Sequence, residues 1–355
     1  MPNPLRLGLI GCGGIVQLSH APSYLAIPSM VDVVALADPV EANLAHLGTT
    51  FDVPPTERYA DYHEMLAQAD LDVVTIATPH HLHVEHALNA IAAGVAVISE
   101  KPMALTLADA DAILAAAAKQ GVAYSVVHNF LFAPGTQRAL ARMQSGELGQ
   151  TLYGRAKSLF SKSEEQADPK SVWRASKVAG GGALNDTAYH EIYLVEALVG
   201  SPICAVEARI QTSYFEFAVD DLALLFFDHQ NGAVSTVSTG WAVPGSGGGE
   251  IANLAEVHAK GGSLRVERRG QALWQSTRRS DGSSGGWEEI ELPTLALLSA
   301  EDRRCIGHVN YFAATCAALV NGMDLPVTGQ QARHNLAIIE AARQATIERS
   351  AIPVE

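Results

Sequence analysis

The segment Val95-Ala96-Val97-Ile98-Ser99-Glu100-Lys101-Pro102 decides how the rest of the chain is interpreted. Its apolar half is short, rich in β-branched residues and bounded by Gly94 and Pro102, which predicts a buried strand of a parallel sheet. Ligands of open α/β sheets bind just beyond the carboxyl ends of such strands. Glu100 and Lys101 are therefore expected at a ligand site. The alternative is that both are ordinary solvated charges at the end of a strand.

The composition indicates an ordinary globular protein with two domains. The chain has 355 residues, and its 48% hydrophobic and 17% charged residues allow a large buried interior. A formal net charge of −14 argues against nucleic acids and anionic membranes as partners, because an acidic surface repels phosphates. No apolar stretch approaches the ~18 residues that a membrane span requires.

The cysteines and the amino-terminal stretch predict a cytoplasmic protein. The chain has four scattered cysteines and no C-x-x-C pair, which fits a reducing compartment and the absence of structural zinc. The apolar stretch Leu5–Ile10 lacks the basic region and the cleavage site of a signal peptide. We therefore expect free thiols and no secretion signal.

A glycine-rich turn follows the first predicted strand, Leu5–Ile10. Glycines there would let the main chain approach a pyrophosphate, whose charge the amides at the following helix N-terminus would meet. Val16 stands at the third glycine position of G-x-G-x-x-G and would move the helix slightly away from the strand. A plain glycine-rich turn is the alternative. The predicted cofactor contacts of this turn are Gly11, Cys12, Gly13, Gly14 and Ile15.

The second predicted strand, Val31–Ala37, ends in Asp38. A carboxylate at this distance from the glycines is suited to accept hydrogen bonds from an adenosine ribose. The residues that follow, Pro39–Glu41, offer nothing to a 2′-phosphate. The sequence therefore predicts NAD, with NADP less favoured. The alternative for Asp38 is a turn-forming Asp-Pro pair.

Helices and strands continue to alternate up to residue 128, which predicts a doubly wound parallel sheet. The histidine-rich stretch Thr78–His86 could suggest a metal site, but no second ligand cluster supports one, so no metal is predicted. We expect a helix start beside the nicotinamide ribose instead, with contacts from Thr78, Pro79, His80 and His83. The remaining predicted elements of this first domain, 1–128, are helices at 41–51, 61–69 and 107–119 and strands at 73–77 and 123–128.

The second half, 129–355, predicts an α+β domain with an antiparallel or mixed sheet and helices on one face. Gln230-Asn231-Gly232 predicts a hairpin turn, and the Gly/Ser-rich stretches 245–249 and 278–286 predict mobile loops. The final helix is expected to dock back on the first domain. The predicted strands are 152–160, 203–212, 221–228, 233–241, 254–259, 264–268, 272–275 and 287–292, and the predicted helices are 134–145, 301–321 and 330–349.

Inside this domain, Gly180-Gly181-Gly182 precedes Asp186 and His190. The two residues are four positions apart and would share one face of a helix. A carboxylate beside an imidazole orients the ring and favours its protonated form, as a proton-transferring pair requires. A buried hydrogen-bonded couple without a catalytic role is the alternative.

Three further residues of this domain have side chains suited to bind a hydroxyl-rich ring, because aromatic faces and guanidinium donors recognise such a ring. Core packing explains the aromatic ones equally well. These predicted substrate contacts are Trp173, Arg174 and Tyr189.

Taken together, the glycine turn, Asp38, Glu100-Lys101-Pro102 and Gly180–His190 resemble the Gfo/Idh/MocA family of glucose-fructose oxidoreductase and inositol dehydrogenase, over nearly the whole chain. The resemblance implies an N-terminal Rossmann domain that binds NAD(P). It also implies a C-terminal domain with a large open, mostly antiparallel sheet, which binds a sugar or cyclitol and forms a homodimer or homotetramer. By the same resemblance Lys101, Asp186 and His190 form the catalytic group and contact the substrate. Glu100, Lys101 and Asn129 complete the expected cofactor contacts.

Three departures from the family pattern limit these expectations. Val16 replaces a small residue, and Leu131 stands where many relatives have an arginine. Ala188 and Tyr193 replace a glycine and an aspartate often seen around the histidine. The expected activity is hydride transfer between nicotinamide and a secondary alcohol, with either His190 or Lys101 as proton acceptor. The alternatives are a glycosidase that uses NAD transiently and a dinucleotide-sensing regulator without catalysis.

Overall fold

The computed structural model describes residues 3–161, 173–216, 218–243, 253–293 and 299–355. The chain forms two compact units: unit 1 is 1–129 with 300–333, and unit 2 is 130–299 with 334–355. Residues 300–333 thus differ from the sequence-based division, which placed them in the second domain. Their place in unit 1 has a physical basis, because the Tyr311 hydroxyl lies 2.7 Å from Ser125 Oγ and the Phe312 ring packs 4.5 Å from the Tyr24 ring.

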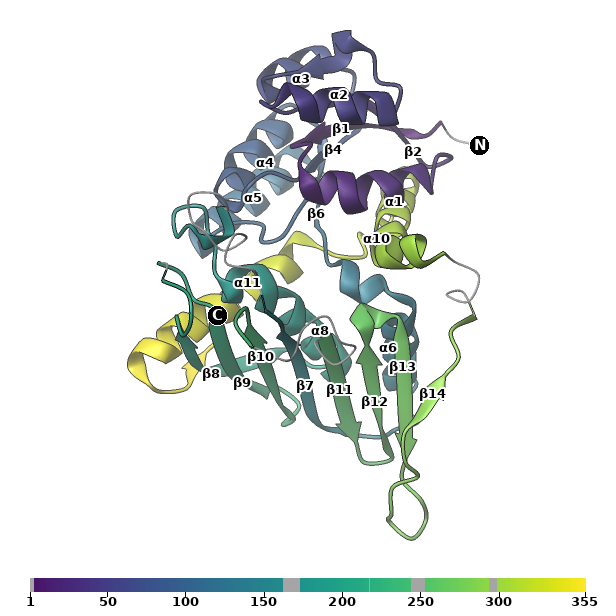
Figure 1. The fold of residues 1–355 in the computed structure, drawn as a ribbon, viewed down its shortest axis with the longest axis vertical. Helices are drawn as coiled ribbons and strands as arrows, with labels where there is room; N and C mark the ends of the chain where they lie inside the picture. The colour runs from purple at the N-terminus through teal and green to yellow at the C-terminus, as the bar shows by residue number, and fades with distance from the viewer. Residues whose placement is uncertain (1–2, 162–172, 217, 244–252, 294–298) are drawn as a thin grey trace. The chain divides into compact units, whose positions relative to one another are not determined.

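Unit 1 contains a six-stranded parallel sheet in the order β3-β2-β1-β4-β5-β6. Strands β1, β2, β4 and β6 of this sheet are labelled in Figure 1. Its central strands are mostly apolar and largely buried, because helices cover both faces of the sheet, as in other parallel sheets. This confirms the predicted doubly wound sheet. The strands are β1 (Leu5–Ile10), β2 (Val31–Ala37), β3 (Arg58–Tyr59), β4 (Val73–Ile76), β5 (Ala96–Ser99) and β6 (Tyr124–Val126). The sequence missed β3, which is too short to show a pattern, and overestimated the length of β6.

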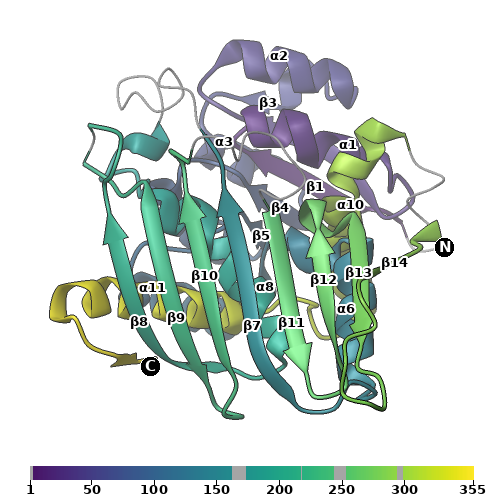
Figure 2. The same cartoon turned by 60° about the horizontal axis from the view of Figure 1, so that its bottom comes forward.

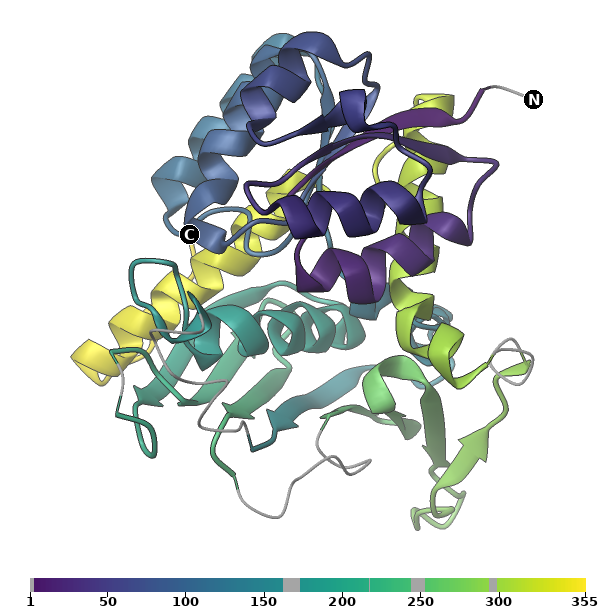
Figure 3. The same ribbon diagram turned by 45° about the horizontal axis from the view of Figure 1, so that its top comes forward.

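Helices lie on both faces of this sheet, as Figure 3 shows. The best predicted of them is α5, which begins after Thr106, whose Oγ1 accepts a hydrogen bond from the amide of Asp109, and ends at Gly121, whose φ is 66°. The helices of unit 1 are α1 (Ala21–Leu25), α2 (Glu41–Thr50), α3 (Tyr62–Gln68), α4 (His83–Ala92), α5 (Leu107–Gln120) and α10 (Ala300–Asn321).

Unit 2 contains a nine-stranded sheet in the order β14-β13-β12-β11-β7-β10-β9-β8-β15. Strands β7 and β10 pair in parallel, and the other neighbouring strands pair antiparallel. This confirms the predicted large, mostly antiparallel sheet. The strands are β7 (Thr151–Leu159), β8 (Ile203–Gln211), β9 (Leu222–His229), β10 (Val234–Gly240), β11 (Asn253–Ala259), β12 (Gly262–Glu267), β13 (Ala272–Thr277), β14 (Glu288–Ile290) and β15 (Ile352–Pro353).

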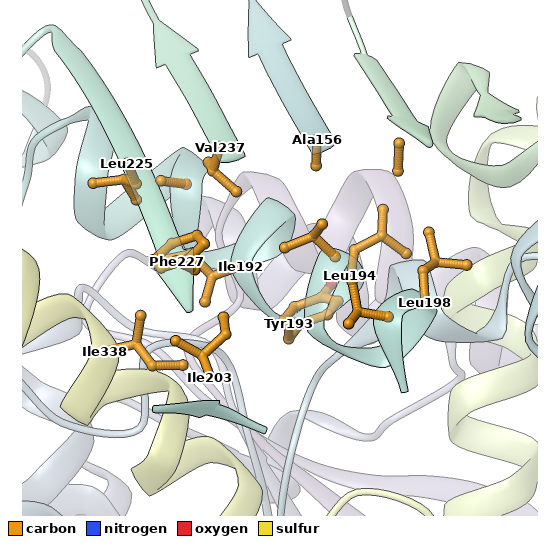
Figure 4. Close-up of a cluster of buried hydrophobic side chains, with 14 of the residues drawn as sticks. Ala156, Ile192, Tyr193, Leu194, Leu198, Ile203, Leu225, Phe227, Val237 and Ile338 are labelled. Carbon is orange, nitrogen blue, oxygen red and sulfur yellow. The ribbon is translucent and has the colours of Figure 1, made fainter. Parts of the chain in front are cut away.

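Helices cover one face of the nine-stranded sheet, as Figure 2 shows. Strand β9 alternates accordingly: Leu225 and Phe227 are buried, whereas Leu224 and Phe226 are exposed on the other face. The buried side chains pack against α8 and α11 (Figure 4). The helices are α6 (Pro134–Gln144), α8 (Tyr189–Val199) and α11 (Gly329–Glu348).

The predicted hairpin turn joins β9 to β10, and its glycine, Gly232, has a φ of 82°. Of the two predicted mobile loops, 245–249 lies outside the described residues, and 278–286 forms the exposed connection from β13 to β14. Within the described ranges, none of the helices is both long enough and apolar enough to cross a membrane.

Candidate active site

The glycine turn after β1 leaves space that the protein does not fill. Gly11 has a φ of +89°, and a Cβ there would lie 2.8 Å from the carbonyl oxygen of Ala77, so packing alone requires this glycine. At Gly13 and Gly14, by contrast, a Cβ would meet no atom within 4 Å. The absence of side chains at these two positions is what close approach of a dinucleotide phosphate requires. The turn therefore fits the predicted cofactor.

The chain after the turn begins as a π-helical turn, Val16–His20, and continues as α1. Val16, at the third glycine position, is completely buried. The Gln17 side-chain amide donates to the carbonyl oxygen of Cys12 at 2.9 Å and so braces the turn. The Cys12 side chain is buried as well, which leaves only its main chain to take part in a cofactor contact. Ile15 remains exposed at the rim of the turn.

Asp38 ties the end of β2 to the glycine turn. Its Oδ2 accepts a hydrogen bond from the Cys12 amide at 2.7 Å, and its Oδ1 accepts from the Val40 amide at 2.8 Å and the Asn43 side chain at 3.2 Å. A carboxylate oxygen has room for about two hydrogen bonds, so Oδ2 can still accept one from a ribose hydroxyl. The sequence predicted the ribose contact but not the structural role.

The predicted cofactor contacts that follow β4 differ in how exposed their side chains are. Thr78 and Pro79 are partly exposed, and His80 lies in the short 3-10 turn that follows them. His83 is 0% exposed, and its two ring nitrogens each lie 2.8 Å from a main-chain carbonyl oxygen, those of Pro102 and Thr78. Because both nitrogens contact the main chain, the side chain of His83 is not available to a cofactor. We therefore correct its assignment to a structural position.

Glu100 and Lys101 follow β5 directly, and each is 9% exposed. The Lys101 amide donates to Glu100 Oε2 at 3.0 Å, and His20 Nε2 lies 2.8 Å from Glu100 Oε1. Burial alone would raise the pKa of Glu100, but the hydrogen bond from His20 and the nearby positive charges, including Lys101, lower it below its ordinary value. Glu100 is therefore ionised at neutral pH. Asn129, the last expected cofactor contact, is buried at the start of a 3-10 turn.

In unit 2 the glycine run Gly180-Gly181-Gly182 packs closely against the main chain of Arg174. The Gly182 amide donates to the Arg174 carbonyl oxygen at 2.9 Å, and a Cβ at Gly181 would overlap that oxygen. The Arg174 guanidinium lies 4.5 Å from the Trp173 ring centroid, and its Nε lies 3.2 Å from Asp186 Oδ2. The glycines thus place a cation, an aromatic face and a carboxylate next to one another.

Asp186 and His190 lie on different types of helical turn. Asp186 is in the π-helical turn Leu184–Ala188, whereas His190 is in the first turn of α8, so the spacing of four does not align them as it would on one α-helix. His190 Nδ1 lies 2.9 Å from the Tyr193 hydroxyl, and the Phe130 ring stacks on the imidazole at 4.5 Å. The prediction that Asp186 orients His190 stays a prediction.

Tyr189 is a buried core residue. Its side chain is 0% exposed and belongs to the hydrophobic cluster between α8 and the sheet. The core-packing alternative therefore holds for Tyr189. Trp173 and Arg174 are partly exposed and remain candidates for a substrate contact.

Comparison with known proteins finds a family match for each of these two units. Residues 5–128 match an oxidoreductase family with an NAD-binding Rossmann fold, and residues 136–265 match the GFO/IDH/MocA C-terminal domain. The chain belongs to the Gfo/Idh/MocA family.

Individual relatives differ in how much of the chain they cover. Levoglucosan dehydrogenase of Pseudarthrobacter phenanthrenivorans is 34% identical over 59% of this chain, and the aligned part is 54% of that enzyme's length. scyllo-Inositol 2-dehydrogenase (NADP(+)) IolW of Bacillus subtilis is 24% identical over 99% of this chain and 96% of its own. A solved structure of levoglucosan dehydrogenase with NADH and levoglucosan has a TM-score of 0.86 and 26% identity, and covers 99% of both chains.

Several residues around the Gfo/Idh/MocA motifs were not predicted from the sequence. Tyr193 lies three positions after His190, a helical spacing that could have indicated the contact. His20 and Phe130 carried no such signal, because their partners, Glu100 and His190, are 80 and 60 residues away along the chain. The motifs located the candidate residues, but their partners come from distant segments.

Proposed function

We propose that this chain is an NAD-dependent oxidoreductase that transfers a hydride between nicotinamide and a secondary alcohol of a sugar, a sugar derivative or a cyclitol. The observation that supports it best is the open space over Gly13 and Gly14 in the β1 turn of a Gfo/Idh/MocA chain. The chain also keeps the family's lysine and histidine at Lys101 and His190. Relatives named for levoglucosan and scyllo-inositol suggest a polyhydroxylated ring as the substrate class.

Each proposed catalytic residue has a separate task. His190 takes the proton of the substrate hydroxyl, and Tyr193 holds the ring through a contact to Nδ1. The Lys101 ammonium donates to the substrate oxygen and stabilises the negative charge that develops there. The competing assignment makes Lys101 the base. When bound, the nicotinamide supplies the acceptor for the hydride that leaves the substrate carbon.

A substrate panel tests this function against its alternatives. The purified protein would be incubated with NAD and with inositols, aldoses, anhydrosugars and glycosides, while NADH absorbance and products are followed. Net NADH formation with a ketone product supports the dehydrogenase. Glycoside cleavage without net NADH would indicate the transient-redox glycosidase. NAD binding without turnover of any class would indicate a regulator.

Asp38 is proposed to set the preference for NAD. In a variant with Asp38→Ser and Pro39→Arg, the ratio of kcat/KM for NADP to that for NAD should rise at least ~10-fold, because a hydrogen bond to a charged group contributes about 1.5–3 kcal/mol. Asp32→Ser, on the exposed side of β2, is the matched control. An unchanged ratio in the double variant would refute the assignment. The loss of the Cys12 contact should lower activity with both cofactors alike.

The proposed assembly is a homodimer or homotetramer formed through the uncovered face of the nine-stranded sheet, in the cytoplasm. Apolar side chains are exposed along this face, Phe226 at 56%. All four cysteines are free thiols, which suits a reducing compartment.

We expect Phe226→Glu to dissociate the oligomer at micromolar concentration, because an unpaired charge is costly to bury in an interface. Sedimentation velocity would measure the change. Val178→Glu, at an exposed apolar position outside the sheet, should leave assembly unchanged. A native protein that sediments as a monomer would contradict this assembly.

A further inference from the structure

The main chain on both sides of Lys101 is held by buried histidines from other elements of unit 1. Upstream, His20 reaches from the π-helical turn to Glu100. Downstream, His83 reaches from the start of α4 to the carbonyl oxygen of Pro102. Both histidines are 0% exposed, and neither belongs to the reacting groups of the proposed function.

The upstream contact runs through both oxygens of Glu100. Oε1 lies 2.8 Å from His20 Nε2, and Oε2 accepts the Lys101 amide at 3.0 Å. A buried carboxylate is stable only when such partners satisfy it. Losing His20 would therefore leave Glu100 Oε1 without this partner, and a reorientation of the carboxylate toward a new partner would shift the Lys101 main chain that Oε2 binds.

The downstream contact joins the loops after two neighbouring strands. His83 Nδ1 lies 2.8 Å from the Pro102 carbonyl oxygen, after β5, and Nε2 lies 2.8 Å from the Thr78 carbonyl oxygen, after β4. Burial lowers the pKa of His83, so the ring is neutral at neutral pH and carries one N–H, which donates to one of the two carbonyl oxygens. The other ring nitrogen packs against the second carbonyl oxygen without donating to it. The imidazole therefore lies between the two loops and fills the space that separates them.

A metal site is the rival explanation for the upstream contact. Among the described residues, His20, Glu100 and His308 are buried and have ligand atoms within 4.8 Å of one another. Two imidazoles and a carboxylate can bind a transition metal. The 2.8 Å between His20 Nε2 and Glu100 Oε1 fits a direct hydrogen bond between the two groups. A metal would have to replace this hydrogen bond, so the metal content of the purified protein separates the two explanations.

We propose that His20, through Glu100, and His83, through Pro102, are positioning residues for the Lys101 ammonium. This proposal rests on the proposed role of Lys101 in the reaction. A lysine side chain is long and flexible, so its main chain must be fixed if the ammonium is to meet a reacting oxygen. Misplacement of a catalytic group by 1 Å can cost about 10²-fold in rate.

His20→Asn and His83→Asn test the proposal in the full-length protein with NAD and the substrate found in the panel. Each should lower kcat about 10- to 100-fold, because the ammonium is misplaced. The dissociation constant of NADH, measured by fluorescence, should change less than roughly 3-fold, because the glycine turn is untouched. His46→Asn, at an exposed position of the same unit, is the matched control and should keep native kcat.

A double-mutant cycle with Lys101→Met separates positioning from general damage. If the histidines act through Lys101, adding either substitution to Lys101→Met should lower kcat no further. The proposal would be overturned if the histidine substitution lowered kcat by the same factor in the Lys101→Met variant as in the native protein. This outcome would count against positioning even when Lys101→Met alone confirms the role of Lys101. Near-native kcat in Lys101→Met would instead refute that role itself.

Glu100 variants test the upstream contact, between His20 and Glu100, if a histidine variant fails to fold. Glu100→Gln retains an oxygen for the Lys101 amide and should keep more activity than Glu100→Ala, and equal losses would overturn the proposal. Elemental analysis of the purified protein decides the metal question. We expect no stoichiometric transition metal, and one that is lost in His308→Ala would overturn the proposed role of His20.

Discussion

Replacing Lys101 with Met should lower kcat at least ~10²-fold, the scale of a lost charge-stabilising or acid/base group. Methionine keeps the length of the side chain but removes the ammonium, which we propose to meet the substrate oxygen. NADH should still bind, because the glycine turn and Asp38 do not depend on the ammonium. Steady-state kinetics and NADH fluorescence titration measure the two effects. Turnover within roughly threefold of the native rate would remove Lys101 from the mechanism.

Lys101→Arg distinguishes the two roles proposed for the lysine. Arginine keeps the positive charge and the hydrogen-bond donors but stays protonated at any usable pH. If Lys101 stabilises the charge on the substrate oxygen, the arginine variant should retain measurably more activity than Lys101→Met. If Lys101 is the base, both variants should be equally inactive. Lys119→Met, at an exposed position in the last turn of α5, is the matched control.

Replacing His190 with Ala should also lower kcat at least ~10²-fold, because it removes the proposed proton acceptor. The imidazole is well suited to this task, since Tyr193 and Phe130 fix the ring on α8 through a hydrogen bond and a stacking contact. Steady-state kinetics with the substrate found in the panel measures the loss. A variant with native kcat would show that another group accepts the proton.

Tyr193→Phe tests whether the orientation of His190 matters separately from its presence. Removing the hydroxyl leaves Nδ1 without this hydrogen bond, so we expect a loss of about 10-fold in kcat, smaller than in His190→Ala. Tyr214→Phe, at an exposed tyrosine of the same unit, serves as the control. In His190→Ala, the additional Tyr193→Phe substitution should have no further effect. A further loss there would assign Tyr193 a role of its own.

Most of the architecture follows from local sequence patterns. The alternation of short apolar strands with helices predicted the parallel sheet of unit 1, because strands buried on both faces have no polar side. The two-residue alternation of strands such as β9 predicted a sheet with one covered face. Helix ends were predicted within about one residue where a cap or a glycine marks them, as at Thr106 and Gly121.

The sequence by itself determined where the chemistry-bearing residues stand: the glycine turn at 11–14, Asp38, Glu100-Lys101 and His190 each follow a recognisable local pattern. Only the tertiary structure decided their partners, such as His20 for Glu100, and assigned residues 300–333 to unit 1. It also placed Tyr189 in the core and both nitrogens of His83 against the main chain. The reason is physical: local patterns record which face of a strand or helix is buried. A hydrogen bond between residues 80 positions apart depends on how distant segments pack, which no local periodicity records.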